Sequence, residues 1–130
     1  MSLAICTIKK WREIDSMIKI SDIQTFREKI GTEKPTVVVF KTEWCPDCRF
    51  IEPFIPELTE LYKERFSFFQ IDRDELPDLS EEYQIMGIPS FIVFKSGEEK
   101  SRYVNKLKKT RAEIEAFLDE ASAICSKEAH

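Results

Sequence analysis

A run of apolar residues followed by a closely spaced cysteine pair constrains this chain more than any other feature. Residues 37–40 read Val-Val-Val-Phe, and Cys45 and Cys48 follow shortly after. Four consecutive apolar residues indicate a strand that is covered on both faces, as in parallel sheets. From Cys45 to about Phe66 the apolar residues instead follow the period of a helix. The pattern therefore predicts a buried strand that delivers the cysteine pair to the start of a helix.

Strands and helices alternate along the rest of the chain. This alternation predicts an α/β fold with a central mixed sheet and helices on both of its faces. Two sequences resemble capping boxes, one beginning at Ser21 and one running from Thr110 to Glu113. Pro53 and Pro56 predict a kink near residues 49–53 of the long helix. The expected strands are 17–20, 36–41, 68–71, 91–94 and 100–104, and the expected helices are 21–31, 45–66, 79–83 and one from residue 110 onward.

The chain has 130 residues, a length that suits one domain. We assign residues 17–126 to this domain, residues 1–16 to an N-terminal extension with a short amphipathic helix over 3–14, and residues 127–130 to a tail. The net charge of −4 argues against nucleic acid as a partner, and no apolar run reaches the roughly 20 residues of a membrane span. The N-terminus lacks the pattern of a secretory signal, so we expect a cytoplasmic protein whose thiols are reduced.

The spacing of Cys45 and Cys48 favours redox chemistry. The two residues share one face of the predicted helix, close enough for their sulfurs to form a disulfide. At a helix N-terminus, unpaired N–H groups favour a thiolate at Cys45, and a thiolate can attack a disulfide. Cys48 lies one turn further in and would resolve the resulting mixed disulfide. Pro46 suits the first helical turn, where its missing N–H costs nothing.

Half of a zinc site is the alternative interpretation of the pair. Zinc usually takes four ligands, and one pair supplies two of them. The other candidates, Cys6, Cys125 and His130, lie near the termini without ligand spacing, so we expect no metal. Cys125 falls beside the apolar face of the last helix and is expected in the core. Nothing in the sequence supports its pairing with Cys6.

The segment Trp44-Cys45-Pro46-Asp47-Cys48-Arg49 resembles the active-site motif of the thioredoxin family. A second segment, Gly87-Ile88-Pro89-Ser90, is similar to the family's loop with a cis proline that faces the cysteines. The resemblance covers about residues 17–126 and is closest to small bacterial thioredoxin-like proteins with Trp-Cys-Pro-Asp-Cys. It implies a thioredoxin-like fold, a cis bond between Ile88 and Pro89, and no cofactor besides the cysteine pair.

The chain departs from the family's pattern next to the cysteines. Typical members carry a buried Asp six residues before the first cysteine, where this chain has Val39, and Pro46-Asp47 replaces their Gly-Pro. Another group, or water, must therefore accept the proton of Cys48. Our hypothesis assigns this role to Asp47, or secondarily to Glu43. Such a carboxylate would oppose ionisation of the first thiol. Asp47 as a solvated residue that starts the helix is an equally open interpretation.

The resemblance implies a thiol–disulfide oxidoreductase that reduces protein disulfides. Cys45 would attack and Cys48 would resolve, while Ile88 and Pro89 would help to bind the substrate strand. Trp44 would frame the site, partly as a packing residue. The expected electron donor is a thioredoxin-reductase-like protein or a low-molecular-weight thiol, and the expected protein is a monomer. A non-catalytic interaction or redox-sensing module of the same fold is the alternative. The basic residues between Lys106 and Arg111 are expected to form a solvated loop.

Overall fold

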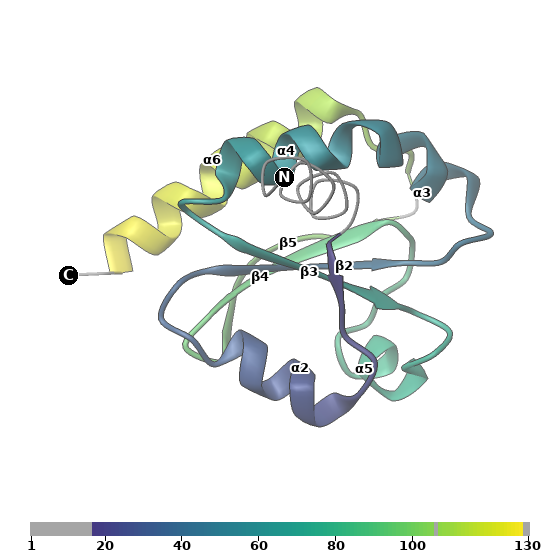
Figure 1. Ribbon diagram of the computed structural model, residues 1–130, viewed down its shortest axis with the longest axis horizontal. Coiled ribbons are helices and arrows are strands. Elements are labelled where there is room, and N and C mark those ends of the chain that lie inside the picture. The colour runs from purple at the N-terminus through teal and green to yellow at the C-terminus, as the bar shows by residue number, and fades with distance from the viewer. Residues whose placement is uncertain (1–16, 106, 129–130) are drawn as a thin grey trace, which may run out of the picture.

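The computed structural model describes residues 17–105 and 107–128 as a five-stranded sheet between two layers of helices (Figure 1). The predicted α/β class with a mixed sheet is confirmed. The expected helix over residues 3–14, together with Cys6, Lys106 and His130, lies outside the described residues. The elements are β1 (Ile18–Lys19), α2 (Ile23–Ile30), β2 (Thr36–Lys41), α3 (Pro46–Ile51), a 3₁₀ turn (Glu52–Phe54), α4 (Ile55–Tyr62), β3 (Ser67–Asp72), α5 (Pro77–Glu82), β4 (Ser90–Lys95), β5 (Glu98–Tyr103) and α6 (Arg111–Glu128).

The sheet has the strand order β1-β3-β2-β4-β5, with β2 at its centre. Strand β3 pairs in parallel with both β1 and β2, whereas β4 is antiparallel to β2 and to β5. The register of the β2–β4 pair sets Phe40 opposite Ser90. The last residues of β2 and the first residues of β4 therefore lie side by side at one end of these strands. The segments that continue from them meet there.

Helices cover both faces of the sheet, which explains the apolar run in β2. Figure 1 shows α3, α4 and α6 over one face and α2 and α5 over the other. Val38 and Phe40 belong to the core cluster on the α2 side, and Val37 and Val39 belong to the cluster on the α6 side. All four side chains are essentially inaccessible to solvent. Burying each such side chain contributes about 1.5–3 kcal/mol.

Helix α2 begins one residue later than the sequence predicted. Asp22 is the N-cap in place of Ser21, and its Oδ1 accepts a hydrogen bond of 2.7 Å from the Thr25 N–H. The charged carboxylate is a strong acceptor for an unpaired N–H at a helix start, so Asp22 takes this position. The predicted capping box at the start of α6 is confirmed, because Glu113 accepts from the Thr110 N–H at 2.9 Å.

The long helix predicted after Cys45 is interrupted at the expected place. Helix α3 ends at Ile51, a 3₁₀ turn carries Pro53, and α4 then continues to Tyr62. The missing N–H of Pro53 and its ring prevent a continuous α-helix, which explains the break. The helix ends at Tyr62 and not near Phe66.

The hairpin between β4 and β5 turns at Ser96 and Gly97, as predicted. Both residues have positive φ angles, 53° and 84°, which match a tight two-residue hairpin turn. Strand β5 starts at Glu98, two residues earlier than expected. Cys125 is buried in the cluster on the α6 face, as predicted. In the described ranges, none of the helices is both long enough and apolar enough to cross a bilayer.

Replacing Phe94 with Ala should reveal how much the α2 side of the core contributes to stability. The Phe94 ring is inaccessible to solvent and meets Phe26 and Tyr83 edge-on, with centroids 5.6 Å and 5.4 Å away. We expect Phe94→Ala to lower the free energy of unfolding by about 3–5 kcal/mol in urea titrations. The control Leu61→Ala removes an exposed side chain and should change it by less than about 0.5 kcal/mol. Equal effects of the two substitutions would contradict this packing.

Candidate active site

Cys45 occupies the junction between the β2 strand and helix α3. It is the N-cap of α3, and its Sγ accepts a hydrogen bond of 3.3 Å from the Cys48 N–H. Pro46 is in the first helical turn, as predicted. The two cysteines are thiols and are not joined by a disulfide. One turn of helix therefore holds both sulfurs on the same side, with a donor aimed at the first.

The two thiols differ in their surroundings. Cys45 is 5 % exposed and Cys48 is 1 % exposed, which agrees with the expectation that Cys48 is the more buried one. Burial raises the pKa of the Cys48 thiol to about 12, and the hydrogen bond with Cys45 acts in the same direction. The Thr42 backbone and the charge of Lys41 oppose this rise. Cys48 is therefore a protonated thiol in the reduced protein at neutral pH.

The segment 87–90, which resembles the cis-proline loop of the family, meets the cysteine pair where β2 ends and β4 begins. The Ile88–Pro89 peptide bond is cis, as predicted. The Cys45 thiol donates a long hydrogen bond to the Ile88 carbonyl, with a distance of 3.8 Å from sulfur to oxygen. Ser90 is buried behind this loop, and its hydroxyl donates to the Gly87 carbonyl. The pairing of β2 with β4 thus unites the two segments that carry the family resemblance.

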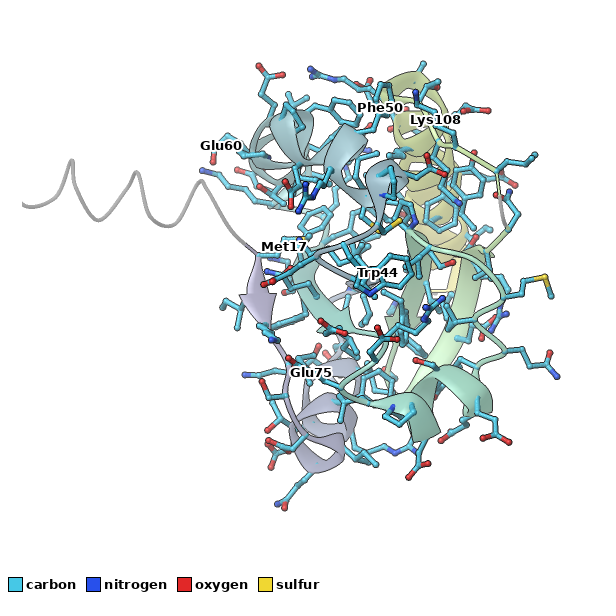
Figure 2. All side chains as sticks on the ribbon, turned by 90° about the vertical axis from the view of Figure 1, so that its right-hand side faces the viewer. Met17, Trp44, Phe50, Glu60, Glu75 and Lys108 are labelled. Atoms are coloured by element: carbon cyan, nitrogen blue, oxygen red, sulfur yellow. The ribbon has the colours of Figure 1, made fainter. Side chains whose placement is uncertain are left out.

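Trp44 directly precedes Cys45 in the chain, and its side chain is labelled near the centre of Figure 2. It is 60 % exposed, so the packing part of the predicted mixed role is small. The indole Nε1 donates to Asp74 Oδ2 at 3.0 Å, and the Arg73 guanidinium carbon lies 5.6 Å from the ring centroid. These two residues from the loop after β3 hold the ring in place without covering it.

Arg49 and Asp47 flank the cysteine pair on helix α3. The Arg49 Nε donates to the Glu43 carbonyl at 2.9 Å, which ties α3 to the loop before it. Asp47 is partly buried in the first turn of α3. The Glu43 side chain is exposed. Asp47 is adjacent to Cys48 in the sequence and is more buried than Glu43, so it remains the better candidate of the two proton acceptors. Its role stays a prediction.

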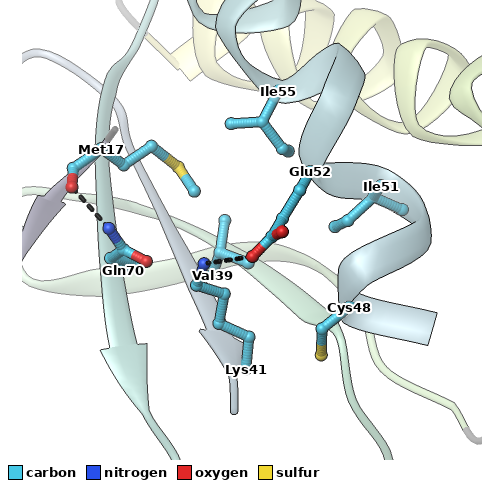
Figure 3. Close-up of a pocket in the computed structure, with 8 residues that line it drawn as sticks. All are labelled: Met17, Val39, Lys41, Cys48, Ile51, Glu52, Ile55 and Gln70. Carbon is cyan, nitrogen blue, oxygen red and sulfur yellow. Dashed lines mark hydrogen bonds and ion pairs between the residues drawn. The ribbon is translucent and has the colours of Figure 1, made fainter. Parts of the chain in front are cut away.

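A cavity of about 250 Å³ lies beside Cys48, where the family's buried carboxylate is missing (Figure 3). Val39, which takes the place of that carboxylate in the sequence, lines the cavity. Two charged groups also face it: Lys41 Nζ and Glu52 Oε1 form an ion pair of 3.8 Å. This ion pair was not predicted from the sequence. The only signal for this ion pair in the sequence is a Lys at the end of an otherwise apolar strand and a Glu one turn after the second cysteine.

Lys109 contradicts the prediction of a solvated loop between Lys106 and Arg111. Its side chain is fully buried, whereas the neighbouring Lys108 is exposed and its Nζ lies 3.9 Å from the Phe50 ring centroid. Figure 2 shows Lys108 and Phe50 next to each other at the top of the molecule. A row of basic residues gives no hint of which one turns inward, because that choice depends on the tertiary contacts of the loop.

Cys125, the third cysteine in the part of the chain that the structure describes, lies apart from the pair. Cys125 belongs to the core cluster on the α6 face, whereas Cys45 and Cys48 belong to the cluster on the opposite face. Across the ranges 17–105 and 107–128, no three His, Cys, Asp or Glu side chains gather in a way that could hold a metal ion. The cysteine pair is thus the chemical centre of the site.

Comparison with known proteins agrees with this geometry. The sequence model of the Thioredoxin family matches residues 17–120. A thioredoxin of Acidithiobacillus ferridurans is 33 % identical over 105 residues, which cover 81 % of this chain and 95 % of that protein. An H-type thioredoxin of Fagopyrum esculentum is 32 % identical over 106 residues, covering 82 % of this chain and 81 % of that protein.

Solved structures show the same fold. A thioredoxin of Malassezia sympodialis superposes with a TM-score of 0.73 at 25 % identity, covering 83 % of this chain and 92 % of that one. A thioredoxin of Nicotiana alata gives a TM-score of 0.68 at 28 % identity, covering 81 % of this chain and 91 % of that one. This chain therefore belongs to the thioredoxin family and is a thiol–disulfide oxidoreductase of the thioredoxin kind.

Proposed function

We propose that the protein reduces disulfide bonds of other proteins through Cys45 and Cys48. The Cys45 thiolate attacks one sulfur of the substrate disulfide, forms a mixed disulfide and releases the other sulfur as a thiolate. Cys48 then loses its proton and attacks the Cys45 sulfur. The products are the substrate dithiol and a Cys45–Cys48 disulfide, so two electrons pass to the substrate. The observation that carries this proposal is the shared turn of α3, where Cys45 accepts the Cys48 N–H.

Exposed apolar side chains near the cysteines support a protein substrate. Trp44, Phe50, Met86 and Leu107 are all exposed, and they belong to the segments that border the pair. Exposed apolar side chains that gather around one site mark a contact surface, whereas isolated ones are common on any protein surface. The Ile88 carbonyl, which faces Cys45, adds a backbone acceptor that an extended substrate chain could use.

The oxidised pair must be reduced again before the next turnover. We propose a thioredoxin-reductase-like protein or a low-molecular-weight thiol as the electron donor, in a cytoplasmic setting where such donors are present. The small dithiol dithiothreitol can replace the donor in vitro. A non-catalytic module with the same fold would bind partners but would not turn over with any donor.

Substituting the two cysteines separately should split the reaction into its steps. We expect Cys45→Ser to abolish insulin reduction by dithiothreitol above the uncatalysed rate, because the attacking sulfur is lost. Cys48→Ser should instead accumulate a mixed disulfide with the substrate, visible as a larger species on non-reducing gels. Turbidity of reduced insulin measures the first outcome. An unaltered protein that gives no turnover would exclude the reductase and leave the interaction module.

The raised pKa of Cys48 predicts selective alkylation of the reduced protein. At about pH 8 a thiol with a pKa of about 12 is almost fully protonated, and only thiolates react rapidly with iodoacetamide. Peptide mass spectrometry should therefore find Cys45 modified and Cys48 unmodified. Raising the pH toward 12 should increase labelling of Cys48, and unfolding in guanidinium chloride should expose both. Equal labelling of the two in the folded protein at pH 8 would contradict the difference in burial.

The proton that Cys48 loses provides a test of Asp47. If Asp47 accepts it, Asp47→Asn should slow insulin reduction by about tenfold or more. The same substitution should move the pH dependence of Cys45 alkylation to lower pH, because a nearby negative charge is removed. Glu52→Gln is the variant to compare with Asp47→Asn, because the Glu52 carboxylate is another acidic group near Cys48 and lines the same cavity. An Asp47→Asn protein with unchanged rate and pH dependence would leave Asp47 as a solvated residue of the helix start.

A further inference from the structure

The cavity beside Cys48 contains an acidic side chain to which the proposed chemistry has given no role. Lys41, Glu52 and Cys48 all line this cavity, and the ion pair of 3.8 Å between Lys41 Nζ and Glu52 Oε1 holds the carboxylate there. Figure 3 shows the Glu52 side chain reaching from its helix toward Lys41 on β2, with Cys48 on the same helix. A carboxylate and the more buried sulfur therefore border one shared space.

The helical spacing places Glu52 and Cys48 on the same face. Glu52 follows Cys48 by four residues, and its backbone angles, φ −49° and ψ −44°, continue the helical conformation of α3. Side chains four residues apart on a helix are neighbours, with about 5–6 Å between their Cβ atoms. Asp47 directly precedes Cys48, and adjacent residues of a helix point in directions about 100° apart. Glu52 therefore shares a helix face with the Cys48 thiol, whereas Asp47 does not.

A buried hydroxyl without a partner indicates water beside this carboxylate. A second cavity, of about 210 Å³, is lined by Lys41, Glu52 and Gln70, which also line the first, and by Thr42. The Thr42 hydroxyl is buried and makes no hydrogen bond to any part of the chain that the structure describes. Such an unpaired hydroxyl is costly, and buried water commonly satisfies groups of this kind.

Both cavities have the room and the polar groups that water needs. A water molecule takes up about 30 Å³ in the liquid and needs about two to four polar partners in a protein. The cavities offer the Lys41 ammonium, the Glu52 carboxylate and the Gln70 amide, which is held in place by its hydrogen bond of 2.6 Å to the Met17 carbonyl. A short chain of water molecules can therefore connect the Cys48 sulfur with Glu52.

We propose that Glu52 accepts the proton of Cys48 through water in this cavity. The proposal rests on the proposed function and deepens it, because it assigns the proton route of the resolving step. The S–H bond of Cys48 breaks, and a water molecule takes this proton while it passes one of its own to the carboxylate. The Cys48 thiolate then bonds to the Cys45 sulfur, and the substrate sulfur leaves as a thiolate. More than half of the Glu52 side chain is exposed, so the carboxyl afterwards releases its proton to solvent.

The test follows the reduced protein as it reacts with excess dithiobis-nitrobenzoate, a small disulfide that releases a coloured thiolate. Attack by Cys45 releases the first nitrothiobenzoate at a rate proportional to the reagent concentration. Attack by Cys48 on the mixed disulfide then releases the second at a rate independent of that concentration. The protein ends with a Cys45–Cys48 disulfide, and the reagent has gained two electrons. Stopped-flow absorbance therefore isolates the step in which Cys48 loses its proton.

We expect Glu52→Gln to slow the second phase about tenfold or more at about pH 7, because the acceptor is lost. Hydroxide must then remove the proton, so the rate of this variant should rise with pH and approach that of the parent at about pH 10. The first phase should stay within about twofold of the parent, since attack by Cys45 does not use Glu52.

Two further variants serve as controls. Glu52→Asp keeps a carboxylate and should slow the second phase by less than about threefold. Glu64→Gln removes an exposed carboxylate just beyond α4 and should match the parent in both phases. Because the Glu52 side chain is more than half exposed, neither substitution at this position removes packing from the core.

The pH profile separates proton transfer from a structural role. A second phase that Glu52→Gln slows equally at every pH would overturn the proposal. So would a Glu52→Gln protein that matches the parent throughout, or an Asp47→Asn protein that shows the expected profile in its place. Failure of the unaltered protein to release the second nitrothiobenzoate would instead remove the proposed function. The two failures are therefore distinguishable.

Discussion

The pairing register between β2 and β4 is the constraint on which the rest of the site depends. With Phe40 opposite Ser90, the chain leaves β2 toward Cys45 at the point where it enters β4 from Pro89. Two segments that are some forty residues apart in sequence therefore face each other. A shift of this register by one residue would turn every β2 side chain to the other face and separate Cys45 from the Ile88 carbonyl. The burial of β2 on both faces makes such a shift costly.

The sequence predicted those parts of the fold that local rules determine. The apolar run of β2, the helical period after Cys45 and the Ser96-Gly97 turn each follow from steric and hydrophobic preferences of neighbouring residues. The break at Pro53 has the same origin. The position of Pro89 opposite the cysteines came from the resemblance to the thioredoxin family, because only the tertiary structure brings the two segments together. At the start of α2, two residues compete for the cap, and local rules alone do not choose Asp22 over Ser21.

The parts of the site that the sequence did not reveal depend on tertiary contacts. Lys109 is buried because Asn105 and Leu107 turn their acceptors toward it, a feature that no periodic pattern encodes. Lys41 meets Glu52 at the point where helix α3 passes into the 3₁₀ turn. Lys109 is a charged residue in a buried position, whereas Lys41 and Glu52 remain partly exposed beside the cavity. Such departures from the usual distribution of charge are where functional sites are expected, since a buried charge is costly unless it is partnered.

The edges of the sheet have a consequence for the behaviour of the protein at high concentration. In the described part of the chain, β1 and β5 are the outer strands. Strand β1 has two residues, and β5 reads Glu-Glu-Lys-Ser-Arg-Tyr. An outer strand that is very short or highly charged is a poor template for strand addition by another molecule. The apolar strands β2 and β4 lie in the interior of the sheet. The segments most prone to self-association therefore have neighbours on both sides and cannot pair with a strand of another molecule.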